Sequence, residues 1–262
     1  MKTTKMQSEV KYHFVCILTS LALLLLVTSA WSGTLRYNFE DANQLNDWKQ
    51  LVEPEHPGGQ WFIENGELLF KSQDNWCFAN ILFIGNDTWT DYEVEYRFRI
   101  DKTFLPPGCA NSYGLIGVLV HLQFGDEIRG IYTGPHDFEG DEIWEINISA
   151  ILAGSSLLGV GDAFSVTDVM TEPASLKEGV WYSSRVIANG NQYEWFIDGQ
   201  SMWQFEAISL QLMHGTVALY TRNCEARFDD VTITGNTIPN VVTTVSPRGK
   251  LAAAWGEIKR SR

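Results

Sequence analysis

The segment from Tyr92 to Ile100 alternates between apolar and polar side chains without a break. Its apolar positions are Tyr92, Val94, Tyr96, Phe98 and Ile100, and its polar positions are Glu93, Glu95, Arg97 and Arg99. A period of two is that of a β-strand, whose successive side chains point to opposite faces of a sheet. The segment therefore predicts a strand with one face in the core and the other in water, where its charges pair.

A three-stranded meander is predicted farther along the chain. The segments 181–187 and 192–197 are separated by Ala188-Asn189-Gly190-Asn191, and Asp198-Gly199 follows the second segment. Asn-Gly and Asp-Gly favour the tight turns that join antiparallel strands. The pattern thus predicts two turns and a third strand that runs through Trp203.

The rest of the chain up to position 240 also indicates strands. Further strands are predicted over 114–124 and 143–151, and a last hairpin is predicted from 216–220 and 225–234 around Arg222-Asn223. In all we expect about ten to thirteen strands. No long stretch before position 245 keeps an apolar period of 3.6 between helix caps, so a parallel sheet with helical crossovers is not supported. We predict an all-β fold, an antiparallel sandwich of two stacked sheets, in one domain over residues 31–240.

The amino-terminal end has a different pattern. Three lysines, Lys2, Lys5 and Lys11, precede an apolar run over 14–27, and the small residues Thr28-Ser29-Ala30 follow. This order is typical of a secretory signal peptide, and we expect cleavage after Ala30. The run is shorter than the roughly 20 residues of a membrane-spanning helix, so an uncleaved anchor is the weaker alternative. We predict that residues 1–30 are a signal peptide, that the mature chain has no membrane span, and that it is secreted or held in the cell envelope.

The carboxyl-terminal residues 241–262 predict a connector followed by a short basic amphipathic tail. Leu251, Trp255 and Ile258 have helical spacing, and basic residues surround them at Arg248, Lys250, Lys259, Arg260 and Arg262. Three roles stay open for this tail. It docks on the acidic body of the protein, it contacts an anionic component of the cell envelope, or it contacts nothing.

Charge and cysteine content narrow the function. The chain has 19 Lys and Arg against 32 Asp and Glu, a formal net charge of −13, which would repel a phosphate backbone, so we expect no nucleic-acid partner. Outside the apolar amino-terminal run the cysteines are Cys77, Cys109 and Cys224, without the spacing of a zinc site or a redox motif. In an oxidising compartment we expect at most one disulfide, and the sequence does not say which pair forms it.

Three stretches carry a family resemblance. They are Tyr37-Asn38-Phe39-Glu40-Asp41 with Trp48, the run 59–68 with the sequence GQWFIENGEL, and the closing Ala226-Arg227-Phe228-Asp229-Asp230-Val231. Together they resemble the concanavalin A-like lectin/glucanase superfamily, and within it the laminin-G-like and 3-keto-disaccharide-hydrolase-like domains of exported bacterial proteins. The resemblance covers about residues 35–235. It implies a jelly-roll sandwich with a concave face that often meets carbohydrate, and it does not by itself assign an activity.

The closing stretch also predicts a β-bulge. Phe228 and Val231 are both residues that a strand would bury, yet they are an odd number of positions apart, and a bulge at Asp229-Asp230 would restore the alternation. In sandwiches of this kind the closing strand often lies beside the opening one, which would bring Asp230 near Glu40 and Asp41. Calcium takes oxygen ligands from carboxylates, so we predict a structural Ca²⁺ held by Glu40, Asp41 and Asp230. Solvated acidic turns are the alternative.

A catalytic interpretation concerns the acidic segment 136–145. The glucanase branch of the superfamily carries E-x-D-x-E on one strand, whereas this chain has Asp141-Glu142-Ile143-Trp144-Glu145 and lacks the middle carboxylate. Asp141 and Glu145 would lie about 13 Å apart along a strand, beyond the range of a glycosidase pair. Glycosidase chemistry through this strand is therefore disfavoured. If the protein is an enzyme, Glu142, Glu145 or His136 would serve as acid or base.

Binding of a glycan is easier to support. Sugar rings stack on aromatic side chains while their hydroxyl groups pair with polar neighbours, and Trp144, Trp76 and Glu142 combine these properties. We therefore predict an exported, non-catalytic carbohydrate-binding or adhesion module, stabilised by calcium. One alternative is a glycoside hydrolase or keto-disaccharide hydrolase acting on sugars derived from polysaccharide. A second is a structural envelope protein attached by its basic tail.

Overall fold

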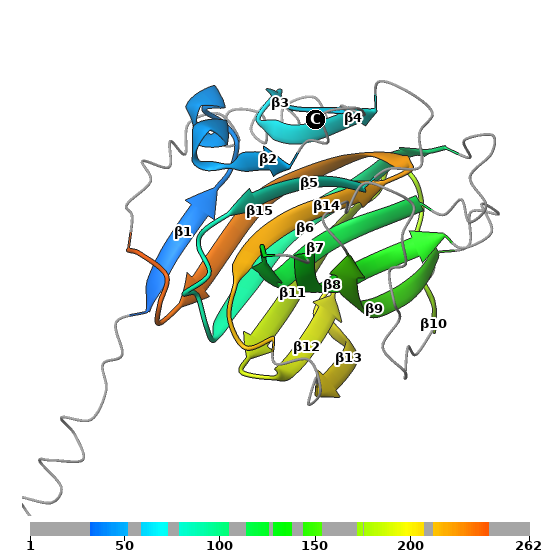
Figure 1. Ribbon diagram of the computed structural model, residues 1–262. Helices are drawn as coiled ribbons and strands as arrows, with labels where there is room; N and C mark the ends of the chain where they lie inside the picture. The colour runs from blue at the N-terminus through cyan, green and yellow to red at the C-terminus, as the bar shows by residue number, and fades with distance from the viewer. Residues whose placement is uncertain are drawn as a thin grey trace, which may run out of the picture. The chain divides into compact units, whose positions relative to one another are not determined.

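The computed structural model describes residues 32–51, 59–72, 79–104, 114–125, 128–137, 144–153, 172–174, 176–206 and 212–240 (Figure 1). Side-chain placement is described for these residues except 79, 136–137, 144–153, 172–174 and 205. The signal peptide and the tail 241–262 predicted from the sequence, together with Trp76, Cys77, Cys109 and Glu142, lie outside the described residues. No helix of the described segments is long and apolar enough to cross a membrane.

The first sheet has eight strands among the described residues. They are β1 (Gly33–Tyr37), β3 (Gly59–Glu64), β4 (Glu67–Ser72), β6 (Tyr92–Thr103), β11 (Trp181–Asn189), β12 (Gln192–Ile197), β13 (Gln200–Glu206) and β15 (Cys224–Gly235). Their order is β13-β12-β11-β6-β15-β4-β3, with β1 also paired to β15, and the pairs are antiparallel. The meander predicted from the sequence is β11-β12-β13, so that prediction is confirmed.

The second sheet has seven strands in the described segments. They are β2 (Lys49–Leu51), β5 (Ala79–Ile84), β7 (Gly114–Gln123), β8 (Ile128–Asp137), β9 (Trp144–Ala153), β10 (Glu172–Ala174) and β14 (Thr216–Arg222). Their order is β10-β9-β8-β7-β14-β5-β2, again antiparallel. A 3-10 helix, η1 (Ala42–Asp47), follows β1. The predicted fold class, an antiparallel two-sheet sandwich, is confirmed.

The core lies between the two sheets. The apolar side chains of β6 that the alternation assigned to the interior are all buried, and they form one cluster with side chains of the second sheet. The second sheet contributes Ile116, Val118, Val120, Val217 and Leu219 to this cluster. Burial of apolar surface from both layers is the main favourable contribution to folding, at about 25 cal/mol for each Å². The two facing layers therefore stabilise each other.

Two predictions about strands are wrong. The segments 216–220 and 225–234 are not a hairpin, because β14 pairs with β5 and β7 while β15 pairs with β1, β4 and β6. The chain crosses from one sheet to the other at Asn223, whose φ of 51° is a turn conformation that asparagine tolerates. The expected ten to thirteen strands were also too few, because the described segments have fifteen, and β8 is among those that were not predicted. Its Ile131, Tyr132 and Thr133 are buried in succession, so it shows no alternation.

The predicted bulge is confirmed. β1 pairs with β15 from Gly33↔Gly235 to Tyr37↔Val231, so the opening and closing strands lie side by side (Figure 1). The pairing of β15 with β6 shifts between Asp229 and Thr232. Asp230 has a φ of 50°, and its backbone N–H donates to Asp229 Oδ1 at 2.8 Å. The bulge leaves Asp229 buried and Asp230 exposed, which restores the burial of both Phe228 and Val231.

The positive φ of Asp230 gives a test of this bulge. Replacement by glycine and by alanine both remove the carboxylate, but only alanine keeps a Cβ that the left-handed region disfavours. We expect Asp230→Ala to be about 1 kcal/mol less stable than Asp230→Gly, measured by urea unfolding. Equal stability of the two variants would contradict the left-handed conformation at this position.

Candidate functional site

The register of the second sheet brings His136 and Glu145 together. The two residues are Cα partners in the β8–β9 pair, and His136 is also the partner of Leu115 on β7. Paired positions of an antiparallel ladder lie on the same face of the sheet. Leu115 packs with the cluster on the face that points away from the first sheet, so His136 and Glu145 occupy neighbouring positions on that outer face. These are two of the three residues that the sequence offered as an acid or a base.

Polar positions continue along the same face of β9. Asn147 is the partner of Gly134, and Ser149 is the partner of Tyr132. The Tyr132 ring lies 5.2 Å from the ring of Tyr220, and both tyrosines are buried. The Tyr132 hydroxyl lies 3.0 Å from two backbone carbonyl oxygens, those of Ile116 and Pro135, to which it donates. Burial raises the pKa of Tyr132 well above its ordinary value, so the hydroxyl stays protonated and remains a donor.

The sequence assigned sugar binding to Trp144, Trp76 and Glu142. Trp144 is the partner of Asp137, one position out of phase with the His136–Glu145 pair. The backbone thus places position 144 on the opposite side of the sheet from Glu145, the side shared with Ile131. Trp76 and Glu142 lie outside the described residues. Sugar binding by these three residues stays a prediction.

The three predicted calcium ligands each have a different environment. Asp41 Oδ1 accepts from the Asn43 backbone N–H at 2.9 Å and caps η1. Asp230 Oδ2 lies 3.5 Å from Arg97 Nη1. Glu40 lies against Gly66, since a Cβ added at Gly66 would be 3.0 Å from Glu40 Oε1.

Within the described segments no group of three His, Cys, Asp or Glu side chains is placed to hold a metal ion. Calcium at these residues stays a prediction from the sequence. Thermal unfolding with and without a chelator tests the calcium prediction. An unchanged melting temperature would contradict a structural calcium ion.

A charged network covers part of the outer face of the first sheet. The Arg227 guanidinium contacts three carboxylates, with 2.7 Å to Glu64, 3.0 Å to Glu67 and 2.8 Å to Asp101. The Trp181 ring is flanked by Arg97 and Arg99 at 4.8 and 5.1 Å. These cations are engaged within the sheet, so the network stabilises strand packing and does not present an open ligand site.

A buried polar cluster connects the two sheets at a bulge in β7. His121 has a φ of 50° there, its backbone N–H donates to the Tyr92 hydroxyl at 2.6 Å, and its Nδ1 lies 2.9 Å from the Leu212 carbonyl oxygen. The Tyr193 hydroxyl, 2.9 Å from the same Nδ1, also donates to the Leu212 carbonyl. Because a carbonyl oxygen only accepts, we assign the imidazole proton to Nδ1. Burial lowers the pKa of His121 to about 4.

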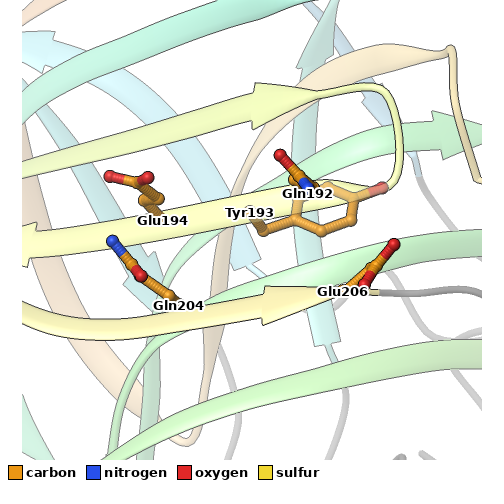
Figure 2. Close-up of a pocket in the computed structure, with 5 residues that line it drawn as sticks. All are labelled: Gln192, Tyr193, Glu194, Gln204 and Glu206. Atoms are coloured by element: carbon orange, nitrogen blue, oxygen red, sulfur yellow. The ribbon is translucent and has the colours of Figure 1, made fainter.

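A polar groove lies on β12 and β13, at the edge of the first sheet (Figure 2). Its volume is about 270 Å³, and its lining residues are Gln192, Tyr193, Glu194, Gln204 and Glu206. The sequence reasoning missed this groove. The available signal was the outward phase of the predicted meander, in which Gln192 and Glu194 alternate with the buried Tyr193 and Trp195.

The fold is shared with solved structures of low sequence identity. A galectin-like protein of unknown function from Bacillus subtilis has a TM-score of 0.56 and 12% identity, and the match covers 78% of this chain and 97% of that chain. An endo-β-galactosidase from Clostridium perfringens that releases GlcNAcα1-4Gal has a TM-score of 0.51 and 10% identity, covering 80% and 64%. No curated protein matches the chain.

These likenesses define the protein as a galectin-like β-sandwich, in agreement with the resemblance found in the sequence. The family assignment is more specific than this fold class. The model of the 3-keto-alpha-glucoside-1,2-lyase-like domain matches residues 37–234, and the chain belongs to that family. The matched range runs from the end of β1 almost to the end of β15, so it includes both sheets.

Proposed function

We propose that this protein recognises saccharides on the outer face of its second sheet, around His136 and Glu145. The observation that carries the proposal is the Cα pairing of these two residues in the middle of a chain that belongs to a sugar-lyase-like family. Imidazole and carboxylate groups are hydrogen-bonding partners for sugar hydroxyls. Asn147 and Ser149 occupy further positions on the same face of β9.

A second candidate function is elimination on a 3-keto-glucoside, which the family and the same pair favour. The carbonyl at C3 of such a sugar acidifies the proton at C2. A general base takes that proton, a double bond forms between C1 and C2, and the C1–O bond breaks while an acid protonates the departing oxygen. This reaction needs one base and one acid, so the missing middle carboxylate that argued against a glycosidase does not argue against it.

The test measures binding and turnover on the same proteins. Purified protein is titrated with a glycan panel that includes a 3-keto-α-glucoside. For each compound, release of the group that leaves with the C1 oxygen is followed. The variants are Glu145→Gln and His136→Gln, with Glu225→Gln on β15 of the other sheet as a matched charge control. If the protein only recognises saccharides, we expect binding without turnover. The affinity should then be about tenfold lower in Glu145→Gln.

The outcomes separate the candidates. Turnover that falls about a hundredfold or more in Glu145→Gln, with binding retained, would contradict the non-catalytic interpretation. It would support the elimination reaction instead. Binding and turnover equal to wild type in both site variants would show that the site lies elsewhere. Absence of binding to every compound of the panel would contradict saccharide recognition itself.

A further inference from the structure

The groove on β12 and β13 is a built feature of the first sheet. Gln192 pairs with Glu206 and Glu194 pairs with Gln204, so the four side chains stand on one face of two adjacent strands. Figure 2 shows Glu194 and Gln204 toward one end of the groove, and Gln192 and Glu206 toward the other. The register of the two strands shifts just beyond Trp195, at an irregularity of the kind that redirects side chains.

The floor of the groove is anchored from below. Tyr193 is 1% exposed, and its hydroxyl donates to the Leu212 carbonyl and contacts His121 of the second sheet. Glu206 is held from the side, because Asn191 Nδ2 donates to Glu206 Oε1 at 3.1 Å. A ligand would therefore meet a surface whose backbone and one carboxylate are already positioned, which lowers the entropic cost of binding.

The lining has a definite charge. It contains two carboxylates and two carboxamides and no Lys or Arg. The neighbouring cation on β11, Arg185, pairs with Glu93 at 2.8 Å and lies over the Phe196 ring, and its charge also interacts with Glu194. The groove thus attracts cations and repels anions, while its carboxamides both donate and accept. Two carboxylates alone do not make a metal site, and the described part of the chain has no three-ligand group.

We propose that this groove binds one unit of an amino sugar that carries a free ammonium group. The ammonium would pair with Glu194 or Glu206, and the ring hydroxyls would pair with Gln192 and Gln204. A volume of about 270 Å³ is at the small end of ligand sites and suits one ring rather than a long chain. The site is independent of the proposed function, because it lies on the other sheet.

The experiment compares three oligosaccharides that differ in charge. Tetramers of glucosamine, N-acetylglucosamine and galacturonate are titrated into the full chain by calorimetry at low salt. We expect the glucosamine tetramer to bind at least tenfold more tightly than the acetylated one, and the galacturonate tetramer to show no binding. Glu194→Gln and Glu206→Gln should each weaken glucosamine binding about tenfold or more, whereas the matched Glu225→Gln should bind as wild type does.

Several results would overturn the proposal. Equal affinity for the acetylated and free-amine tetramers would show that the carboxylates do not select an ammonium group. Unchanged binding in both groove variants would place the ligand elsewhere. Calcium that binds at the groove and is lost in the same two variants, with no glucosamine binding, would show an ion site. A variant that fails to fold is recognised by its far-UV spectrum, and the remaining variant then decides.

Discussion

Replacing Gly134 by alanine is expected to destabilise the protein by about 3 kcal/mol or more, a large effect for a single methyl group. A Cβ at this position would lie 2.1 Å from the Ile116 carbonyl oxygen and 2.6 Å from the Tyr132 hydroxyl. The first contact is with the backbone of β7, so strands β7 and β8 would have to separate. The Tyr132 hydroxyl would also lose its place between the Ile116 and Pro135 carbonyls.

A matched control lies on the same strand. A Cβ at Gly130 would approach Leu122 Cα at 3.3 Å, a tight contact that a small shift relieves. We expect Gly130→Ala to cost about 1 kcal/mol or less. Both variants are measured by urea unfolding, and a Gly134→Ala protein as stable as Gly130→Ala would show that β7 and β8 do not approach as closely as the structure places them.

The second large effect is a loss of stability in acid that depends on His121. Its pKa of about 4 in the folded protein lies below the ordinary value of 6.5, because the ring is buried. Among the described residues Nε2 has no hydrogen-bond partner, so a second proton there would be an unpaired buried donor. The unfolded chain has no such restriction and takes up the proton as the pH falls through 6.5.

The sign of the effect follows from this difference. Stability that is fully present above pH 6.5 is lost progressively as the pH falls from 6.5 toward 4, and the total is about 3 kcal/mol. His121→Asn tolerates the positive φ and should flatten this part of the stability profile, even if the variant is less stable at pH 7. His214→Gln removes an exposed histidine whose charge contributes to the lowered pKa of His121, so it should flatten the profile only in part.

Unfolding is measured at half-unit steps from pH 4 to pH 8. A slope between pH 4 and 6.5 that is the same in His121→Asn and in the unaltered protein would show that His121 is not the group responsible.

The sequence predicted those strands that have one face exposed to solvent. β6 alternates because its outer face carries charges, and β11 to β13 are bounded by Asn-Gly and Asp-Gly turns. β8 was not predicted because consecutive residues of the strand are buried, so its sequence does not alternate between apolar and polar positions. β14 and β15 looked like a hairpin because they are close in sequence, and nothing local to Asn223 shows that the chain changes sheets there.

The candidate site was only partly predictable for a related reason. His136 and Glu145 were both named from the acidic segment, but their pairing depends on the register between β8 and β9, which a single sequence does not specify. The emphasis on Trp144 came from its residue type, whereas the backbone places position 144 on the other side of the sheet from Glu145. The groove required the register of β12 with β13, and Glu206 in particular carries no signal of its own in the sequence.

The most direct test of saccharide recognition on the second sheet is a crystal structure of the protein with a bound 3-keto-α-glucoside. We predict that the sugar lies on the outer face of the second sheet, with ring hydroxyls within hydrogen-bonding distance of His136 and Glu145. A sugar bound only on the outer face of the first sheet, with β8 and β9 untouched, would contradict the proposal.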